Sequence, residues 1–195
     1  MRRKIEGTRR GGRLGWAVAL GLPVLALMVS VVPALAASGG QANLSAARAA
    51  TAAFHTLSAA QAAGYAAEVA DQAGITCIED PQMSGTMGVH YLNPDLAPEL
   101  FGATPGAVEA TTPEILVYEP GSNGQLRLVA LEYLVLRASW DPYHAERPSL
   151  FGQEFDLTLA GNRYGLPDFY SLHAWIWRPN PIDMFAPFNP SVSCD

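Results

Sequence analysis

Residues 114–135, EILVYEPGSNGQLRLVALEYLV, carry the most specific structural signal of the chain. Two apolar runs, residues 114–119 and 126–135, flank the turn-forming sequence PGSNGQ. Strands favour β-branched and aromatic residues, and an Asn-Gly pair between two apolar runs is a strong hairpin signal. This segment therefore predicts an antiparallel β-hairpin, and the rest of the chain is placed around it.

Further elements are predicted on both sides of the hairpin. Residues 87–92 and 170–177 are the other strands. Residues 43–69 are dense in alanine and free of proline, so they predict one long helix or two short helices hinged near Gly64. Residues 139–167 are rich in turn formers, and we expect them to form a loop over the sheet. Four prolines after residue 178 exclude regular structure from the C-terminal tail.

These elements predict an α+β domain in which the N-terminal helix packs on a small curved antiparallel sheet, followed by the proline-rich tail. The regular alternation of strands and helices that a doubly wound α/β sheet needs is absent from the sequence. A small β-barrel with one helix is the alternative architecture. No repeat or long linker divides residues 37–195, so we expect a single domain there.

The first 36 residues are typical of a signal peptide. A basic start is followed by an apolar run over residues 14–32 and by the small-residue exit Ala34-Leu35-Ala36. We therefore expect cleavage after Ala36 and a secreted or extracytoplasmic domain, with no stable membrane association after cleavage. The apolar run is near the roughly 20 residues that cross a bilayer, so an uncleaved leader that anchors the protein in the membrane is the alternative.

The charge balance argues against nucleic-acid partners. The expected leader carries six of the 12 Lys and Arg residues and one of the 18 Asp and Glu residues, which leaves residues 37–195 with a formal charge of −11. An acidic surface repels nucleic acid, and the sequence leaves open whether the partner is a small ligand or a protein. Lys is absent after Lys4, which excludes a lysine Schiff base or a phosphate-loop lysine.

Cys77 and Cys194 are the two cysteines of the chain. In an oxidising compartment we expect a disulfide between them, which would close a loop of over 100 residues and fix the tail to the body of the domain. Two free thiols, or two thiolate metal ligands, are the alternative.

Three residues on the predicted strands are candidate metal ligands: His90, Glu132 and His173. Two imidazoles and one carboxylate on neighbouring strands suit a divalent transition metal, Fe(II), Zn(II) or Mn(II), with open coordination positions. The alternative is structural. In that interpretation the histidines hydrogen-bond to buried backbone or to the tail, and Glu132 pairs with an arginine such as Arg127 or Arg178.

The alternation of side chains along a strand predicts the surroundings of these candidates. Glu132 is expected to share one side of its strand with Leu128, Ala130 and Leu134. His173 is expected to share one side of the last strand with Trp175 and Trp177. Three aromatic residues are predicted to line a pocket, with core packing as the alternative: Trp175, Trp177 and Tyr133.

Three functions are compatible with this pattern. The first is an exported domain that binds a divalent metal through His90, Glu132 and His173. The second is a metal-dependent enzyme that uses the same site with an open, water-filled position. The third is a non-catalytic interaction or structural module without a metal, held together by the disulfide. Convergence of the three side chains would favour the first two, and a cavity beside them would favour the enzyme.

Four motifs carry a resemblance to other proteins: MGVHYLNP (residues 87–94), LVYEP (116–120), LFGQ (150–153) and LHAWIW (172–177). With Cys194 and the Asn-Pro pairs of the tail, they resemble a family of secreted bacterial proteins usually described as hypothetical. The likeness spans nearly all of residues 37–195. It implies a single-domain exported protein and brings no particular activity with it.

Overall fold

The computed structural model describes residues 32–82, 84–102 and 107–195, with side chains from residue 40 onward. The predicted signal peptide, residues 1–36, lies outside the described residues except for residues 32–36, which begin the first helix. Within the described ranges, none of the helices combines the length and apolar character that a membrane span requires.

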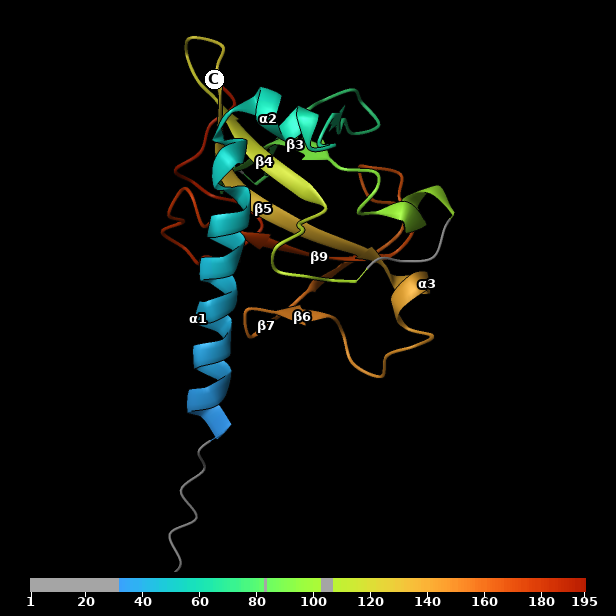
Figure 1. Ribbon diagram of the computed structural model, residues 1–195. Helices are drawn as coiled ribbons and strands as arrows, with labels where there is room; N and C mark the ends of the chain where they lie inside the picture. The colour runs from blue at the N-terminus through green and yellow to red at the C-terminus, as the bar shows by residue number, and fades with distance from the viewer. Residues whose placement is uncertain (1–31, 83, 103–106) are drawn as a thin grey trace, which may run out of the picture. The chain divides into compact units, whose positions relative to one another are not determined.

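One antiparallel sheet organises the described residues (Figure 1). Its seven strands in these ranges are β1 Ala67–Glu68, β2 Cys77–Glu79, β3 Thr86–Leu92, β4 Ile115–Pro120, β5 Leu126–Leu136, β8 Asp156–Thr158 and β9 Phe169–Ala174. The order is β1-β3-β4-β5-β9-β8, with β2 also paired to β3. The predicted hairpin is confirmed as β4 and β5. The sheet is open at β1 and β8, so the α+β class is confirmed and the barrel alternative is wrong.

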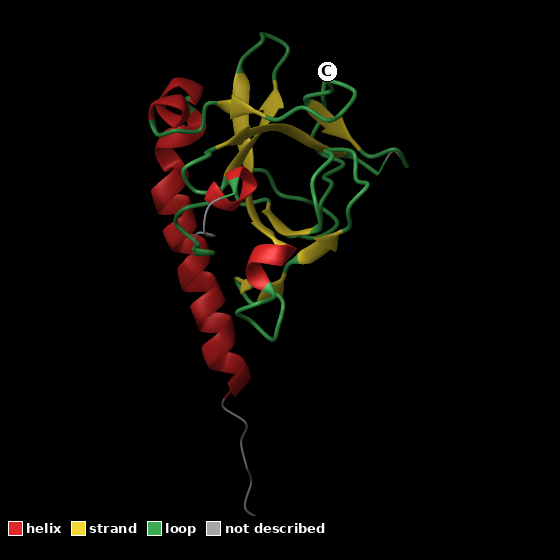
Figure 2. Cartoon of the chain, turned by 90° about the vertical axis from the view of Figure 1, so that its right-hand side faces the viewer, coloured by secondary structure: helices red, strands yellow, loops and turns green. Residues whose placement is uncertain are grey.

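The N-terminal segment is helical, as Figure 2 shows, but its bounds differ from the prediction. It consists of α1 Val32–Thr51, the 3-10 helix η1 Ala52–His55 and α2 Leu57–Ala62. The predicted continuation to residue 69 is wrong. Gly64 does not form a hinge within the helix, because its φ of +101° cannot continue the helix. The chain turns there and enters β1.

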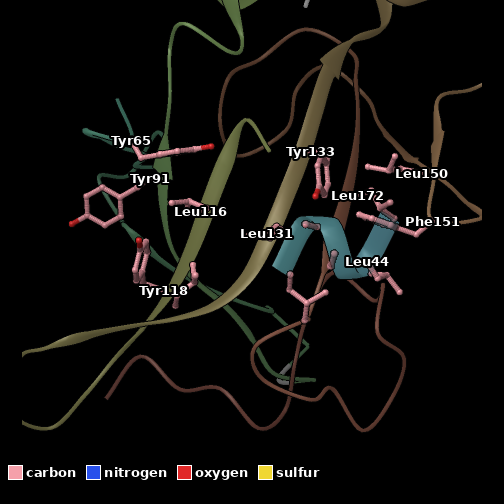
Figure 3. Close-up of a cluster of buried hydrophobic side chains, with 14 of the residues drawn as sticks. Leu44, Tyr65, Tyr91, Leu116, Tyr118, Leu131, Tyr133, Leu150, Phe151 and Leu172 are labelled. Atoms are coloured by element: carbon pink, nitrogen blue, oxygen red, sulfur yellow. The ribbon is translucent and has the colours of Figure 1, made fainter. Parts of the chain in front are cut away.

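Two apolar layers cover the two faces of the sheet. Leu44 and Ala47 place α1 in the first layer, so the predicted packing of the helix on the sheet is confirmed. Figure 3 shows this layer, which includes Leu44, Tyr65, Tyr118, Leu131, Tyr133, Phe151 and Leu172. The second layer includes Leu92, Ile115, Val117, Ala130, Leu134, Phe169 and Trp175. A side chain on the second layer's face of the sheet therefore points away from α1.

A β-bulge in β5 changes which side chains share a face. The register between β4 and β5 shifts at Val129, which is the extra residue. The prediction that Leu128 shares a side with Glu132 is therefore wrong, because Leu128 lies in the layer that contacts α1. Ala130 and Leu134 lie in the other layer, on the side of Glu132 as predicted.

Residues 139–167 contain more regular structure than predicted. The short helix α3 Arg137–Trp140 precedes a small hairpin of β6 Ser149–Leu150 and β7 Gln153–Glu154. β8 then pairs with β9 and extends the main sheet. The last strand was predicted over residues 170–177, but the observed strand β9 ends at Ala174. The amide of Trp175 instead donates to the carbonyl of Met184 at 3.0 Å.

The C-terminal tail is irregular, as predicted, and packs on its own chain. Cys77 in β2 and Cys194 form the predicted disulfide, across a sequence separation of 117. Thr86 and Asn189 exchange two backbone hydrogen bonds, of 3.2 and 2.9 Å, and Asn189 is fully buried. Disulfides persist in oxidising environments, so this bond indicates an extracytoplasmic setting for the domain.

Candidate metal centre

His90, Glu132 and His173 lie on β3, β5 and β9. Glu132 is paired directly with His173 in the antiparallel ladder between β5 and β9. β4 runs between β3 and β5, and the residue of β4 paired with His90 is Val117. The three side chains lie on the face of the sheet away from α1, where Val117 and Leu134 also lie. His90 therefore reaches Glu132 across β4.

The donor atoms of the three residues converge. Nε2 of His90 lies 3.5 Å from Oε2 of Glu132, and Nε2 of His173 lies 3.7 Å from the same oxygen. One donor atom from each residue lies within 4.8 Å of the other two. A tetrahedral ion with bonds of about 2.0–2.1 Å holds its ligand atoms about 3.4 Å apart. The spacing therefore allows one ion to contact all three residues, with further coordination positions open.

Burial determines the protonation of the cluster. The exposed fractions of His90, Glu132 and His173 are 4, 7 and 3%. Burial lowers the pKa of His90 and of His173 to about 4, and it raises the pKa of Glu132. Both imidazoles are therefore neutral at pH 7, the form in which histidine binds metals.

Two of the donor atoms have no hydrogen bond. Nε2 of His90 and Nε2 of His173 are buried, and neither is hydrogen-bonded within the part of the chain that the structure describes. Buried polar atoms nearly always have a hydrogen-bond partner, so two such atoms facing one carboxylate are unusual. A cation between them would satisfy both.

Neighbouring groups orient the ligands. The Ser171 hydroxyl, beside Glu132, lowers the pKa of that carboxyl and so opposes the effect of burial. The indole of Trp175 is stacked on the imidazole of His173, with ring centroids 6.1 Å apart and planes inclined by 17°. Such supporting contacts hold ligand side chains in place around a metal.

Gly88 determines how β3 presents His90. Its φ is +102°, and a Cβ at this position would lie 2.5 Å from the carbonyl oxygen of Tyr118. β3 also shifts register against β2 at this point, and Met87 is the extra residue. A larger residue at position 88 would push β3 away from β4 and displace His90.

We expect Gly88→Ala to lower the free energy of unfolding by at least about 2 kcal/mol, because it combines a strained φ with a backbone clash. Urea denaturation measures the change. Gly124→Ala is the matched control, because φ is +74° there but a Cβ would meet no atom within 4 Å. An equal loss of unfolding free energy in the two variants would contradict the proposed role of the close approach between Gly88 and the Tyr118 carbonyl.

Two cavities flank the cluster. The first, of about 310 Å³, reaches His90 and Glu132 and is otherwise mainly apolar. The second, of about 590 Å³, reaches Glu132 and His173 and is more polar. The polar side chains of the second cavity include Arg147, Asp156, Thr158 and Ser171. Tyr164 and Phe169 line both. An ion at the cluster would therefore face a cavity on each side.

The aromatic residues predicted to line a pocket do not line either cavity. Tyr133 lies in the layer that contacts α1, and its hydroxyl donates to a backbone carbonyl at 2.8 Å. Trp177 lies beyond the end of β9 with its ring 4.4 Å from that of His55. Trp175 is buried beside His173. Trp175 therefore shares the side of His173, as predicted. Trp177 does not, because β9 ends at Ala174 and Trp177 packs against the layer that contacts α1.

Two residues of the site were not predicted. Ser171 precedes His173 by two positions in β9, so strand alternation provided a signal that could have identified it. Tyr164 belongs to the irregular segment before β9. It lines the cavities only because that segment passes beside them. No sequence pattern indicates that position.

The arginines considered as partners of Glu132 contact other groups. Arg127 forms an ion pair with Glu119. Arg178 donates to the carbonyl of Ser191 at 2.7 Å. Within the described ranges, the basic side chains in contact with the Glu132 carboxylate are the two neutral histidines.

The buried cluster of His90, Glu132 and His173 could thus hold a metal ion. Its donor types and spacing are those of two-histidine, one-carboxylate centres. No family model, no curated protein and no solved structure matches this chain.

Proposed function

We propose that this protein is an exported domain that binds one divalent transition metal, Fe(II), Zn(II) or Mn(II), through His90, Glu132 and His173. One observation carries the proposal: two buried imidazole nitrogens without hydrogen bonds face a buried carboxylate. Burying such groups without partners is unfavourable, and a bound cation would offset that cost.

A metal-dependent enzyme is the second candidate function, and the cavities favour it. Three protein ligands leave at least one coordination position for water or substrate. Cavities border the cluster on the sides of His90 and His173, so open positions would be reachable from both. Space of this kind beside an open coordination position suits a bound substrate.

The setting of the domain is part of the proposal. The leader-like residues 1–36 and the disulfide support secretion, with retention as a membrane anchor as the alternative. The formal charge of −11 on residues 37–195 supports the absence of nucleic-acid partners and of stable membrane association after cleavage. Intact mass analysis of the exported protein tests this, with Ala37 expected as its first residue.

Elemental analysis of protein exported and purified without chelator tests the metal site. We expect one transition metal per chain. His90→Ala and His173→Ala should each weaken metal affinity by at least about 100-fold, which is the upper end of the effect of removing a supporting residue. His144→Ala is the matched control, because His144 is exposed and stacked on Trp140, and it should retain wild-type affinity.

Folding is checked separately from binding. Glu132→Gln keeps the shape of the side chain but removes its charge, so it should remain folded by circular dichroism and still bind metal poorly. If the wild-type protein carries no metal and takes up none at micromolar concentrations, the proposal fails. The non-catalytic interaction or structural module is then the better description.

A further inference from the structure

We propose that the 310 Å³ cavity beside His90 and Glu132 binds a small, mainly apolar molecule that carries one polar group, and that this group coordinates the metal. This inference rests on the proposed function, because the metal supplies the anchor for the polar group. It adds the class of ligand and the cavity that takes it.

The cavity has a buried apolar floor and a more open rim. Leu92, Ile115 and Leu134 are buried at the floor. Val69, Leu100 and Leu166 are only partly buried. Phe101, also in the lining, is 67% exposed. A ligand can therefore enter past the rim and place its apolar part against the floor.

Few polar side chains line this cavity. Those in its described lining are His90, Glu132 and Tyr164. Ligand sites are typically apolar pockets with a small number of polar groups that orient the ligand. Because two of the three polar residues are the proposed metal ligands, the ligand's polar group is expected to lie at the metal and its apolar part away from it.

The size and charge of the cavity restrict the ligand further. A volume of about 310 Å³ lies at the lower end of the range for small-molecule sites, which suits one ring or a short alkyl chain. No Lys or Arg belongs to the described lining, so a second anionic group would be unpaired there. The second cavity contains Arg147 and Asp156, so it is the less suitable place for the apolar part.

Two hydroxamates with the same metal-binding head test the inference. In zinc-loaded protein, we expect benzohydroxamate to bind about 30-fold more tightly than acetohydroxamate, the factor that corresponds to burying one additional phenyl-sized apolar group. Leu100→Trp should fill the cavity and remove most of this difference. Ile182→Trp is the control, because Ile182 is 62% exposed and does not line the cavity.

Zinc stoichiometry, measured on every sample, separates the possible failures. If zinc binds at one per chain but wild-type protein binds both hydroxamates equally, the cavity inference is wrong and the metal site stands. The inference is also wrong if Leu100→Trp stays folded, retains zinc and keeps the full preference. If wild-type protein binds no zinc, Fe(II) or Mn(II), the proposed function fails and the inference fails with it.

Discussion

Removal of the disulfide should lower the free energy of unfolding by about 5 kcal/mol, the chain-entropy value for a closed loop of this length. Cys77 and Cys194 are 117 positions apart, so the crosslink restricts most of the unfolded chain of the domain. The double variant Cys77→Ala, Cys194→Ala is the direct test. Urea denaturation followed by tryptophan fluorescence measures the change.

Reduction of the wild-type protein is the control for this experiment, because it breaks the same bond without changing either residue. The reduced protein and the double variant should have matching stabilities. A loss below about 1 kcal/mol in both would contradict the prediction. It would mean that the tail is held by its other contacts, such as the backbone pairing of Thr86 with Asn189 and the hydrogen bonds from Arg178 to Ser191.

Glu114→Gln should stabilise the protein by an amount that increases with pH and approaches about 5 kcal/mol above pH 8. Burial raises the pKa of the Glu114 carboxyl to about 8, although the Leu134 amide donates to it at 3.0 Å. Glu99 and Glu132 are the acidic neighbours that raise it further. Gln keeps an acceptor oxygen for the amide and has no proton to lose.

The sign follows from proton binding in the two states. Between pH 4.5, the ordinary value for a glutamate, and pH 8, folded Glu114 holds its proton and unfolded Glu114 does not. Rising pH therefore favours the unfolded chain by about 1.4 kcal/mol per pH unit, and the wild type loses this stability through the window. Glu114→Gln does not lose stability in this way. The difference in free energy of unfolding between the variant and the wild type should therefore be absent below pH 4.5 and reach its full value above pH 8.

Thermal and urea denaturation of both proteins from pH 4 to pH 9 tests this expectation. Glu109→Gln is the matched control, because Glu109 is exposed, and its effect should stay within about 0.5 kcal/mol at every pH. Parallel stability curves for the wild type and Glu114→Gln would show that Glu114 does not retain its proton in the folded protein.

Local signals in the sequence were sufficient for much of the fold. β4 and β5 follow from two apolar runs around an Asn-Gly turn, and β3 begins within one residue of its prediction. The end of α2 was missed, because alanine-rich sequence continues past Ala62 while the backbone of Gly64 turns out of the helix. β8 was missed because it is three residues long and is stabilised mainly by its pairing with β9.

The sequence predicted which three residues form the candidate site but not which residues surround them. His90, Glu132 and His173 were selected because their residue types suit a metal and because each lies on a predicted strand. The aromatic residues assigned to a pocket were not brought to the cavities. Strand alternation was extended past Ala174 for Trp177, and Tyr133 lies on the opposite face of the sheet from Glu132.

Four features were predictable from the sequence: the α+β class, the hairpin, the pairing of the only two cysteines and the three residues suited to a metal. These features depend on local periodicity, turn chemistry and residue type. Three others are seen only in the folded chain: the strand order that places β9 beside β5, the bulge at Val129 and the two cavities that Tyr164 lines. These depend on contacts between residues far apart in the chain, whose energies no local pattern records.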